Sequence, residues 1–127
     1  MNKKNIFWIA SYPKSGNTWM RSILSSIMYS EDGVFNFELL KNIDQYENAK
    51  NFKFIKDINI DEYKNLNKME IVSKYWKESQ SLISKKNYNI FFKSHSANYN
   101  HNNLKYLNMD HFLGCIYILR DPRDVAI

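Results

Sequence analysis

The sequence contains little cysteine, proline or glycine. Its 127 residues include one cysteine, two prolines and three glycines. A single cysteine excludes an intrachain disulfide framework, which fits a reducing compartment, and we expect a cytoplasmic protein. Cys115 lies in the apolar run 114–119, where a small core residue is a better interpretation than a catalytic thiol. Because no stretch is rich in proline or glycine, no linker is predicted and we expect one domain.

Long apolar stretches and basic runs are also missing. No stretch approaches the roughly 20 apolar residues of a transmembrane helix, and the apolar part of residues 1–10 is too short for the core of a signal peptide. The net charge of +5 comes mostly from lysine, in a chain rich in Lys, Asn and Ile, which indicates compositional bias. No Lys/Arg run is interleaved with aromatic residues. We therefore expect a soluble protein with no membrane span and no nucleic-acid partner.

The remaining pattern is that of an α/β protein. Apolar residues make up 44% of the chain and aromatic residues 16%, enough for a hydrophobic core. Short apolar runs at 6–12, 90–92 (leading into Lys93) and 115–119 do not alternate cleanly with polar residues, which is typical of strands buried on both faces. Helical stripes follow at 18–29 and 68–86, and we expect both stripes to lie in the core. Strands alternating with helices predict a three-layer αβα sandwich with a parallel sheet.

The stripes and the intervening segments give further expectations. The first stripe consists of Trp19, Met20, Ile23, Leu24, Ile27 and Met28, and the second of Met69, Val72, Trp76 and Ile83. Residues 30–67 are predicted to form short helices and loops that cover a ligand. Residues 98–103 are predicted to be a polar loop, and a short helix is expected at 104–107.

Ligands of parallel α/β folds bind at the carboxyl ends of the strands. All three predicted strands end in unusual polar residues, and the first is followed by the loop from Pro13 to Thr18. Gly16 allows positive φ, and the loop amides, the start of the next helix and Lys14 could together hold a phosphate. This loop is not a Walker A motif, because its lysine precedes the glycine. An ordinary capped turn with a solvated lysine is an equal alternative.

Two more groups of polar residues follow the other predicted strands. Lys93 and His95 are two residues apart in a strand and so point to one face, where a cation and a general base could act together. A structural histidine is the alternative. Arg120 ends the third strand, where its guanidinium could bind a phosphate with two hydrogen bonds. Asp121 is expected to cap a helix that begins at Pro122. The alternative is a surface network in which Arg120 and Arg123 pair with Asp121 and Asp124, and Arg123 is expected to belong to it.

These three motifs, in this order, resemble those of the PAPS-dependent sulfotransferases (PAPS, 3'-phosphoadenosine 5'-phosphosulfate). Residues 12–19 resemble the family's 5'-phosphosulfate loop, 93–95 its Lys-Thr-His triplet and 119–126 the start of its 3'-phosphate motif. The resemblance implies a fold like that of the P-loop nucleoside-triphosphate hydrolases. Ser94 stands where the family commonly has threonine.

The resemblance also implies residue roles. The expected catalytic residues are His95 as general base, with Lys14 and Lys93 at the transferring group. The expected donor-binding residues are Lys14, Ser15, Gly16, Asn17 and Thr18 at the 5'-phosphate, Trp19 at the adenine and Arg120 at the 3'-phosphate. The implied reaction transfers a sulfuryl group from PAPS to a hydroxyl or amine of a small-molecule or carbohydrate acceptor. No metal is expected, and His101 and His111 are expected to be surface or packing residues.

Two predicted features of the family lie beyond the sequence. The family's 3'-phosphate motif continues to a serine, which would fall just past Ile127, and a later donor loop is also absent. We therefore expect residues 1–127 to be the N-terminal part of one sulfotransferase domain, truncated at the C-terminus and inactive alone. The alternatives are a non-catalytic nucleotide-binding remnant and a P-loop kinase-like enzyme.

Overall fold

The computed structural model describes residues 3–55, 68–96 and 100–125. By its internal contacts the chain divides into two compact units. Unit 1 comprises Met1–Ile6, Glu47–Asn89 and Asn98–Leu113, and unit 2 comprises Phe7–Tyr46, Ile90–Ala97 and Gly114–Ile127. Both units are assembled from segments far apart in the sequence.

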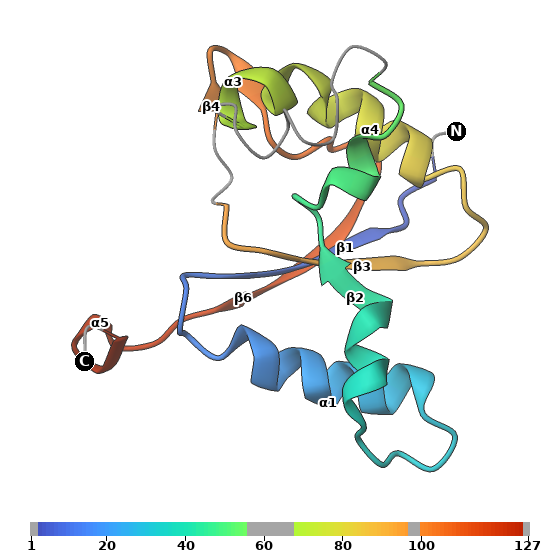
Figure 1. Ribbon diagram of the computed structural model, residues 1–127, viewed down its shortest axis with the longest axis vertical. Coiled ribbons are helices and arrows are strands. Elements are labelled where there is room, and N and C mark those ends of the chain that lie inside the picture. The colour runs from blue at the N-terminus through green and yellow to red at the C-terminus, as the bar shows by residue number, and fades with distance from the viewer. Residues whose placement is uncertain (1–2, 56–67, 97–99, 126–127) are drawn as a thin grey trace. The chain divides into compact units, whose positions relative to one another are not determined.

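A four-stranded parallel sheet is the main element of unit 2 (Figure 1). Its strand order is β2 (Ile43–Gln45), β3 (Ile90–Ser94), β1 (Ile6–Ser11) and β6 (Phe112–Ile118). In the β2–β3 pair Ile43 lies opposite Phe91 and Gln45 opposite Lys93. Helices occupy the connections from β1 to β2 and from β2 to β3, whereas the described part of the connection from β3 to β6 contains two short strands, β4 and β5. The predicted α/β class with a parallel sheet is therefore confirmed.

The core of unit 2 is aromatic. The rings of Trp8, Tyr46 and Phe92 contact one another, with centroids 5.0 Å apart for Trp8–Tyr46, 5.9 Å for Trp8–Phe92 and 5.4 Å for Tyr46–Phe92. All three side chains are buried. Such pairs contribute about 0.5–1.5 kcal/mol each beyond the area that they bury. This cluster therefore fixes β1 against β3, the two strands whose ends carry the predicted loop and histidine.

Helix α1 (Asn17–Tyr29) follows β1 and confirms the first predicted helix, but its predicted core stripe is wrong. Trp19, Ile23, Ile27 and Met28 are exposed, and Met20 and Leu24 are only half-buried. The buried face carries Ser25 and Ser26 instead, whose hydroxyls donate to the carbonyls of Arg21 and Ser22 one turn earlier. Serines satisfied in this way can be buried at little cost, so hydrophobic periodicity alone misidentifies the face.

Strand β2 was not predicted within residues 30–67. The 3₁₀ helix η1 (Phe37–Asn42) precedes it and η2 (Ala49–Phe52) follows it, which agrees with the expected short helices. Residues 56–67, part of the same prediction, lie outside the described residues. A strand of three residues, Ile-Asp-Gln, is too short to show a periodicity, and it forms because β3 offers a strand to pair with.

Strand β6 departs from the prediction in its burial. Leu113, Cys115 and Tyr117 are exposed along it, so β6 alternates between an exposed and a half-buried face. The physical reason is its place at the edge of the sheet. Cys115 is therefore not the small core residue that the apolar run predicted. Desolvation nevertheless raises the pKa of the Cys115 thiol, which disfavours a reactive thiolate.

Unit 1 contains α3 (Lys68–Val72), the 3₁₀ helix η3 (Ser73–Tyr75) and α4 (Trp76–Ile83). These cover most of the predicted second helix, and Val72 and Trp76 of its stripe are buried, whereas the Met69 side chain lies outside the described residues. The indole of Trp76 contacts the ring of Tyr106 at 5.0 Å. Buried Gln80 donates to the Tyr106 carbonyl at 2.7 Å and accepts from the Asn108 amide at 2.9 Å.

The helix predicted at 104–107 is wrong. Residues Leu104–Lys105 form β5, which pairs antiparallel with β4 (Asn100–His101), and Asn102 and Asn103 make the turn with φ of 48° and 66°. Two asparagines tolerate left-handed backbone well, which favours a tight hairpin over a helix. Residues 98–99 of the predicted polar loop lie outside the described residues. In the described part of the chain, no helix is long and apolar enough to cross a bilayer.

Candidate functional site

The loop between β1 and α1 is a compact turn that ends at the start of a helix. The Ser15 amide donates to the Tyr12 carbonyl at 3.3 Å, and the Met20 amide donates to the Gly16 carbonyl at 3.1 Å, the first turn of α1. Among the described residues, no side chain caps this helix. Its first amides therefore remain available to an anion, with the positive end of the helix dipole behind them.

Two residues of this loop have left-handed backbone. Lys14 has a φ of 67° and Gly16 a φ of 105°. A Cβ at Gly16 would meet nothing within 4 Å, so glycine is needed there for its backbone conformation and not for space. Alternation of left-handed residues with others turns successive amides toward one side, as in anion-binding nests. The conformation of Lys14 and Gly16 thus supports the predicted phosphate loop.

The side chain of Asn17 forms hydrogen bonds between the loop and strand β1. Its side chain is buried, with 5% exposed, and its amide nitrogen Nδ2 donates to the Ile9 carbonyl and to the Ser11 hydroxyl, both at 3.1 Å. Ser11 is the last residue of β1 and is also buried. Asn17 begins α1, so these two hydrogen bonds link the end of the strand with the start of the helix.

His95 lies directly after β3, and its ring contacts the end of β1. Its Nδ1 is 3.0 Å from the Ser11 carbonyl oxygen and 3.3 Å from the Ser11 hydroxyl oxygen. Lys93 is half-buried two residues earlier in β3, and its carbonyl accepts from the Tyr46 amide at 3.2 Å. The structure therefore brings His95 to the β1 end of the loop, because β3 and β1 are neighbours in the sheet.

Arg120 reaches the same loop from the end of β6. Its Nη1 donates to the Lys14 carbonyl at 3.4 Å, a long hydrogen bond between residues far apart in the sequence. A cavity of about 450 Å³ lies beside this contact. It is lined by Tyr12, Ser15, Ile118, Leu119, Arg120, Pro122 and Val125. The lining is largely apolar, with Arg120 as its charged group, which suits a ring system that carries a phosphate.

The helix after Arg120 begins as predicted. Helix α5 (Pro122–Val125) starts at the proline, and the Asp121 carboxylate accepts from the Arg123 amide at 2.9 Å. The Arg123 guanidinium also binds Asp121, at 2.6 Å, which holds the pKa of Asp121 below and that of Arg123 above its usual value. Arg123 therefore pairs with Asp121, whereas Arg120 contacts the loop.

Comparison with known families gives one match. The model of the sulfotransferase domain matches residues 4–127, nearly the whole chain. The chain belongs to the sulfotransferase family. No curated protein and no solved structure was found to match it.

The sulfotransferase site predicted from the sequence is partly assembled in unit 2. Ser15 and Arg120 line the cavity, Arg120 also contacts the Lys14 carbonyl, and Asn17 and His95 meet at Ser11. Gly16 and Thr18 belong to the same loop and helix start, whereas the Trp19 side chain is 69% exposed and lines neither cavity described. Of the other histidines, His111 is a packing residue as expected, since its ring contacts the Lys3 carbonyl and the Ser81 hydroxyl.

Three polar residues of unit 2 were not predicted from the sequence, and one of them, Ser11, lies at this site. Ser11 was not singled out, although a polar residue at the end of a buried strand is the signal that could have found it. Arg21 of α1 donates to the Leu40 carbonyl at 3.0 Å. Burial lowers its pKa, and the carboxylate of Asp44 on β2 acts in the opposite direction. Asp44 could not be placed, because β2 was not predicted.

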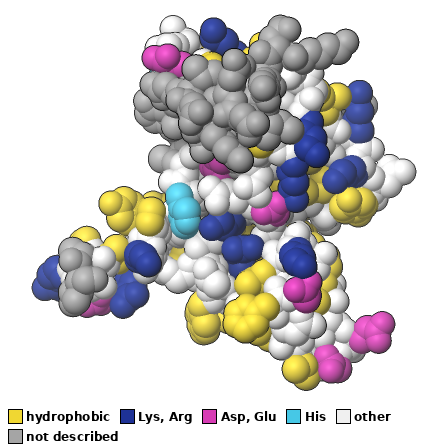
Figure 2. Space-filling model, in the orientation of Figure 1, with side chains coloured by type: hydrophobic (Ala, Val, Ile, Leu, Met, Phe, Trp, Pro, Cys, Tyr) yellow, Lys and Arg dark blue, Asp and Glu magenta, His cyan; other side chains and the backbone are white. Residues whose placement is uncertain are grey.

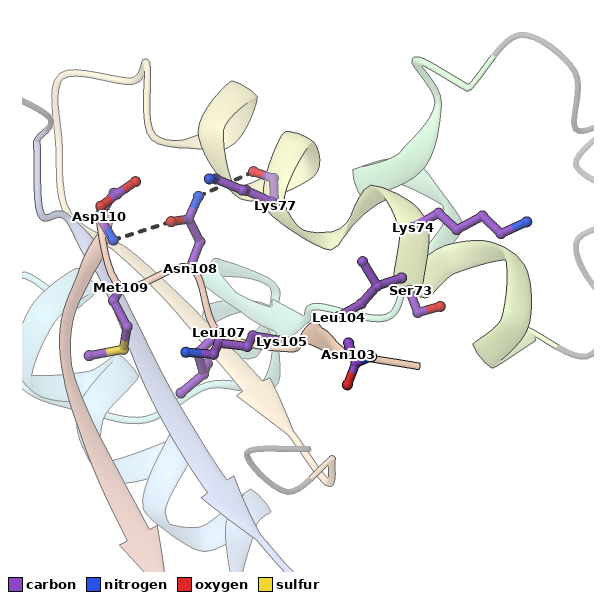
Figure 3. Close-up of a pocket in the computed structure, with 10 residues that line it drawn as sticks. All are labelled: Ser73, Lys74, Lys77, Asn103, Leu104, Lys105, Leu107, Asn108, Met109 and Asp110. Carbon is purple, nitrogen blue, oxygen red and sulfur yellow. Dashed lines mark hydrogen bonds between the residues drawn. The ribbon is translucent and has the colours of Figure 1, made fainter. Parts of the chain in front are cut away.

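A second cavity, of about 380 Å³, lies within unit 1 (Figure 3). Three lysines line it, Lys74, Lys77 and Lys105. Figure 3 shows that the ammonium group of Lys74 points away from those of the other two, so they do not converge on one anion. The side-chain amide of Asn108, in the wall of this cavity, donates a hydrogen bond to the Lys77 carbonyl at 3.3 Å. This cavity lacks the arrangement of a binding site, and the loop at β1 remains the candidate.

Proposed function

We propose that this sulfotransferase takes its sulfuryl group from PAPS and passes it to a hydroxyl or amine of a small-molecule or carbohydrate acceptor. The observation that carries the proposal is that two kinds of group meet at one loop. Arg120 contacts Lys14 on the cavity side of the loop, and the His95 ring contacts Ser11 at its β1 end. A cationic anion site and a base are thus held by the same short segment.

The residues present fit an anionic nucleotide donor. The uncapped start of α1 and the left-handed backbone of Lys14 and Gly16 suit a phosphate or sulfate group. Arg120 supplies a second cation in the lining of the cavity, whose volume of about 450 Å³ is within the range of small-ligand sites. Tyr12 and Leu119 offer apolar surface for a base or ribose. The donor, when bound, supplies the sulfuryl group and leaves as adenosine 3',5'-bisphosphate.

In this proposal, one residue removes the acceptor proton and others stabilise the developing negative charge. His95 takes the proton from the acceptor hydroxyl or amine while the acceptor atom bonds to sulfur and the sulfur–oxygen bond to the phosphate breaks. Lys14, Lys93 and the first amides of α1 stabilise the charge that develops on the transferring and leaving oxygens. The apolar lining of the cavity limits water, which would otherwise compete as acceptor.

The test separates the base from donor binding. In protein made from the complete reading frame, His95→Ala should reduce transfer from labelled PAPS by about 10²–10⁴-fold, since it removes a general base. Binding of adenosine 3',5'-bisphosphate, measured by calorimetry, should be nearly unchanged. His101→Ala is the matched control, because His101 lies on β4 in unit 1, and it should keep full transfer.

Two results would contradict the proposal. Transfer at the unsubstituted rate by His95→Ala would assign the base to another group. Bisphosphate binding without transfer to any hydroxyl or amine acceptor would favour a non-catalytic nucleotide-binding protein.

The place of residues 1–127 as the N-terminal part of one domain stays a prediction, which the reading frame past Ile127 tests. The cytoplasmic location is tested by cell fractionation.

A further inference from the structure

The contact between His95 and Ser11 determines which ring nitrogen carries the proton. The shorter of its two distances, 3.0 Å, joins Nδ1 to the Ser11 backbone carbonyl. A carbonyl oxygen only accepts hydrogen bonds, so the hydrogen must lie on Nδ1. In neutral imidazole the other nitrogen, Nε2, then carries the lone pair. Among the described residues, none is hydrogen-bonded to Nε2.

The opposite tautomer fits the geometry poorly. The Ser11 hydroxyl, 3.3 Å from Nδ1, could donate to an unprotonated nitrogen there. That arrangement would leave the lone pair of Nδ1 facing the carbonyl oxygen at 3.0 Å, two acceptors in contact. It would also put the hydrogen on Nε2, where it could not take a proton from an acceptor. The carbonyl contact therefore selects the tautomer in which Nε2 is the base.

Asn17 holds the partner of His95 in place. Its Nδ2 has two hydrogens, and the Ile9 carbonyl and the Ser11 hydroxyl, both at 3.1 Å, accept them. The Ile9 carbonyl can only accept, so the orientation of the Asn17 amide group is fixed as well. Ser11 and Asn17 are both buried, with 3% and 5% exposed, which limits their rotamers. The end of β1 thus offers His95 a rigid acceptor.

We propose that Ser11 and Asn17 are positioning residues, which orient the His95 ring and hold it in the tautomer with hydrogen on Nδ1, so that Nε2 faces the acceptor. The catalytic meaning of this arrangement rests on the proposed function, whereas the tautomer itself does not. Neither residue touches the reacting atoms in this proposal, and both act through His95. A small change at Ser11 should therefore affect turnover more than donor binding.

The first experiment observes the tautomer directly. Imidazole ¹⁵N NMR of the unsubstituted protein, labelled at histidine, should show His95 with hydrogen on Nδ1 and a bare Nε2. The His95→Ala variant assigns the signal. Hydrogen on Nε2 would overturn the proposal. This readout does not need an acceptor, so a protein with the expected tautomer and no transfer would count against the proposed function and leave the tautomer standing.

The second experiment measures the effect on turnover. Ser11→Ala removes the hydroxyl that receives Asn17 and loosens the ring, and we expect kcat to fall on the order of tenfold. The KM for the donor and the calorimetric affinity for adenosine 3',5'-bisphosphate should stay close to unsubstituted values. Ser11→Thr keeps the hydroxyl and should restore kcat. Equal kcat in all three proteins would overturn the positioning role, as would a loss in donor affinity matching the loss in kcat.

Discussion

At the scale of single residues, Lys14 is a cation with an unusual backbone conformation. It is exposed and lies between the turn at Tyr12 and the start of α1, in a left-handed conformation. We predict that Lys14→Ala weakens donor binding and slows transfer by about 10²–10³-fold, since it removes a charge aimed at the developing negative oxygens. Steady-state kinetics with labelled PAPS and calorimetry with the bisphosphate measure the two effects.

A second lysine provides the control for Lys14. Lys85 is also exposed and lies just after α4 in unit 1, so Lys85→Ala removes the same charge without touching the loop. It should leave kcat and donor affinity unchanged. If Lys14→Ala behaved like Lys85→Ala, the loop would be an ordinary turn with a solvated lysine, the alternative that the sequence left open.

Residues at the ends of strands could be placed from the sequence because one rule covers them all. Parallel strands end at one edge of the sheet, so the loop after Ser11, the residues after Ser94 and Arg120 had to share that edge. Which atoms would touch could not be predicted in this way. The contact of His95 with Ser11 depends on strand order, and a sequence without aligned relatives does not give the order of β3 and β1.

At the scale of elements, α1 illustrates how a periodic pattern can mislead. Its length and start follow from the loop and the stripe, but the stripe is largely exposed and a serine face is buried. A serine whose hydroxyl donates to a carbonyl of its own helix can be buried like an apolar residue. A hydrophobicity pattern counts it as polar and therefore does not detect the buried face. Strand β2 was not predicted for a different reason: it is defined by its pairing with β3 and not by a pattern in its own residues.

Asn5, just before β1, stabilises the segment that follows α4. Its fully buried Nδ2 donates to the carbonyls of Ser84, Lys86 and Tyr88, at 3.0–3.1 Å. We predict that Asn5→Ala lowers the free energy of unfolding by about 1–3 kcal/mol, because these carbonyls lose a fully buried donor. Urea denaturation followed by far-UV circular dichroism measures the change.

Asn5→Asp distinguishes lost hydrogen bonds from lost volume. It keeps the shape of the side chain but turns a donor into a carboxylate that faces three carbonyl oxygens, so it should destabilise the protein more than alanine does. Asn87→Ala is the control at an exposed position of the same segment and should have little effect. If the Asn5→Asp variant were as stable as the unsubstituted protein, these hydrogen bonds would contribute nothing to stability.

At the scale of the whole molecule, unit 2 exposes several large hydrophobic side chains. They lie on α1, on η1, and on or just after β6. Examples are Ile27, Phe37, Tyr117 and Leu119, each with 62–79% of its surface exposed. Figure 2 shows hydrophobic side chains at the surface over α1 and near α5. Apolar surface of this kind promotes association. We predict that the 127-residue chain associates in a concentration-dependent way, as measured by sedimentation velocity.

Single charges on this surface test the cause. Ile27→Lys should shift the chain toward the monomer, because it places a charge among the exposed apolar residues of α1. Tyr117→Lys should do the same on β6, an edge strand without a charged residue. Asn87→Lys adds the same charge at an exposed position in unit 1 and should not change the association. A chain that is monomeric at all concentrations would contradict the prediction.

The order of strands in the sheet has a consequence for synthesis on the ribosome. The phosphate loop is complete once α1 has emerged, but the residue that contacts it as proposed base, His95, is 84 positions beyond Ser11, and Arg120 is 106 positions beyond Lys14. Contacts that span so much of the chain form late, because closing the intervening loop costs entropy before any pairing is gained. A nascent chain therefore carries the proposed phosphate loop without its proposed base until β3 is inserted between β1 and β2, and without Arg120 until β6 has joined the sheet. Only this last step completes the proposed site.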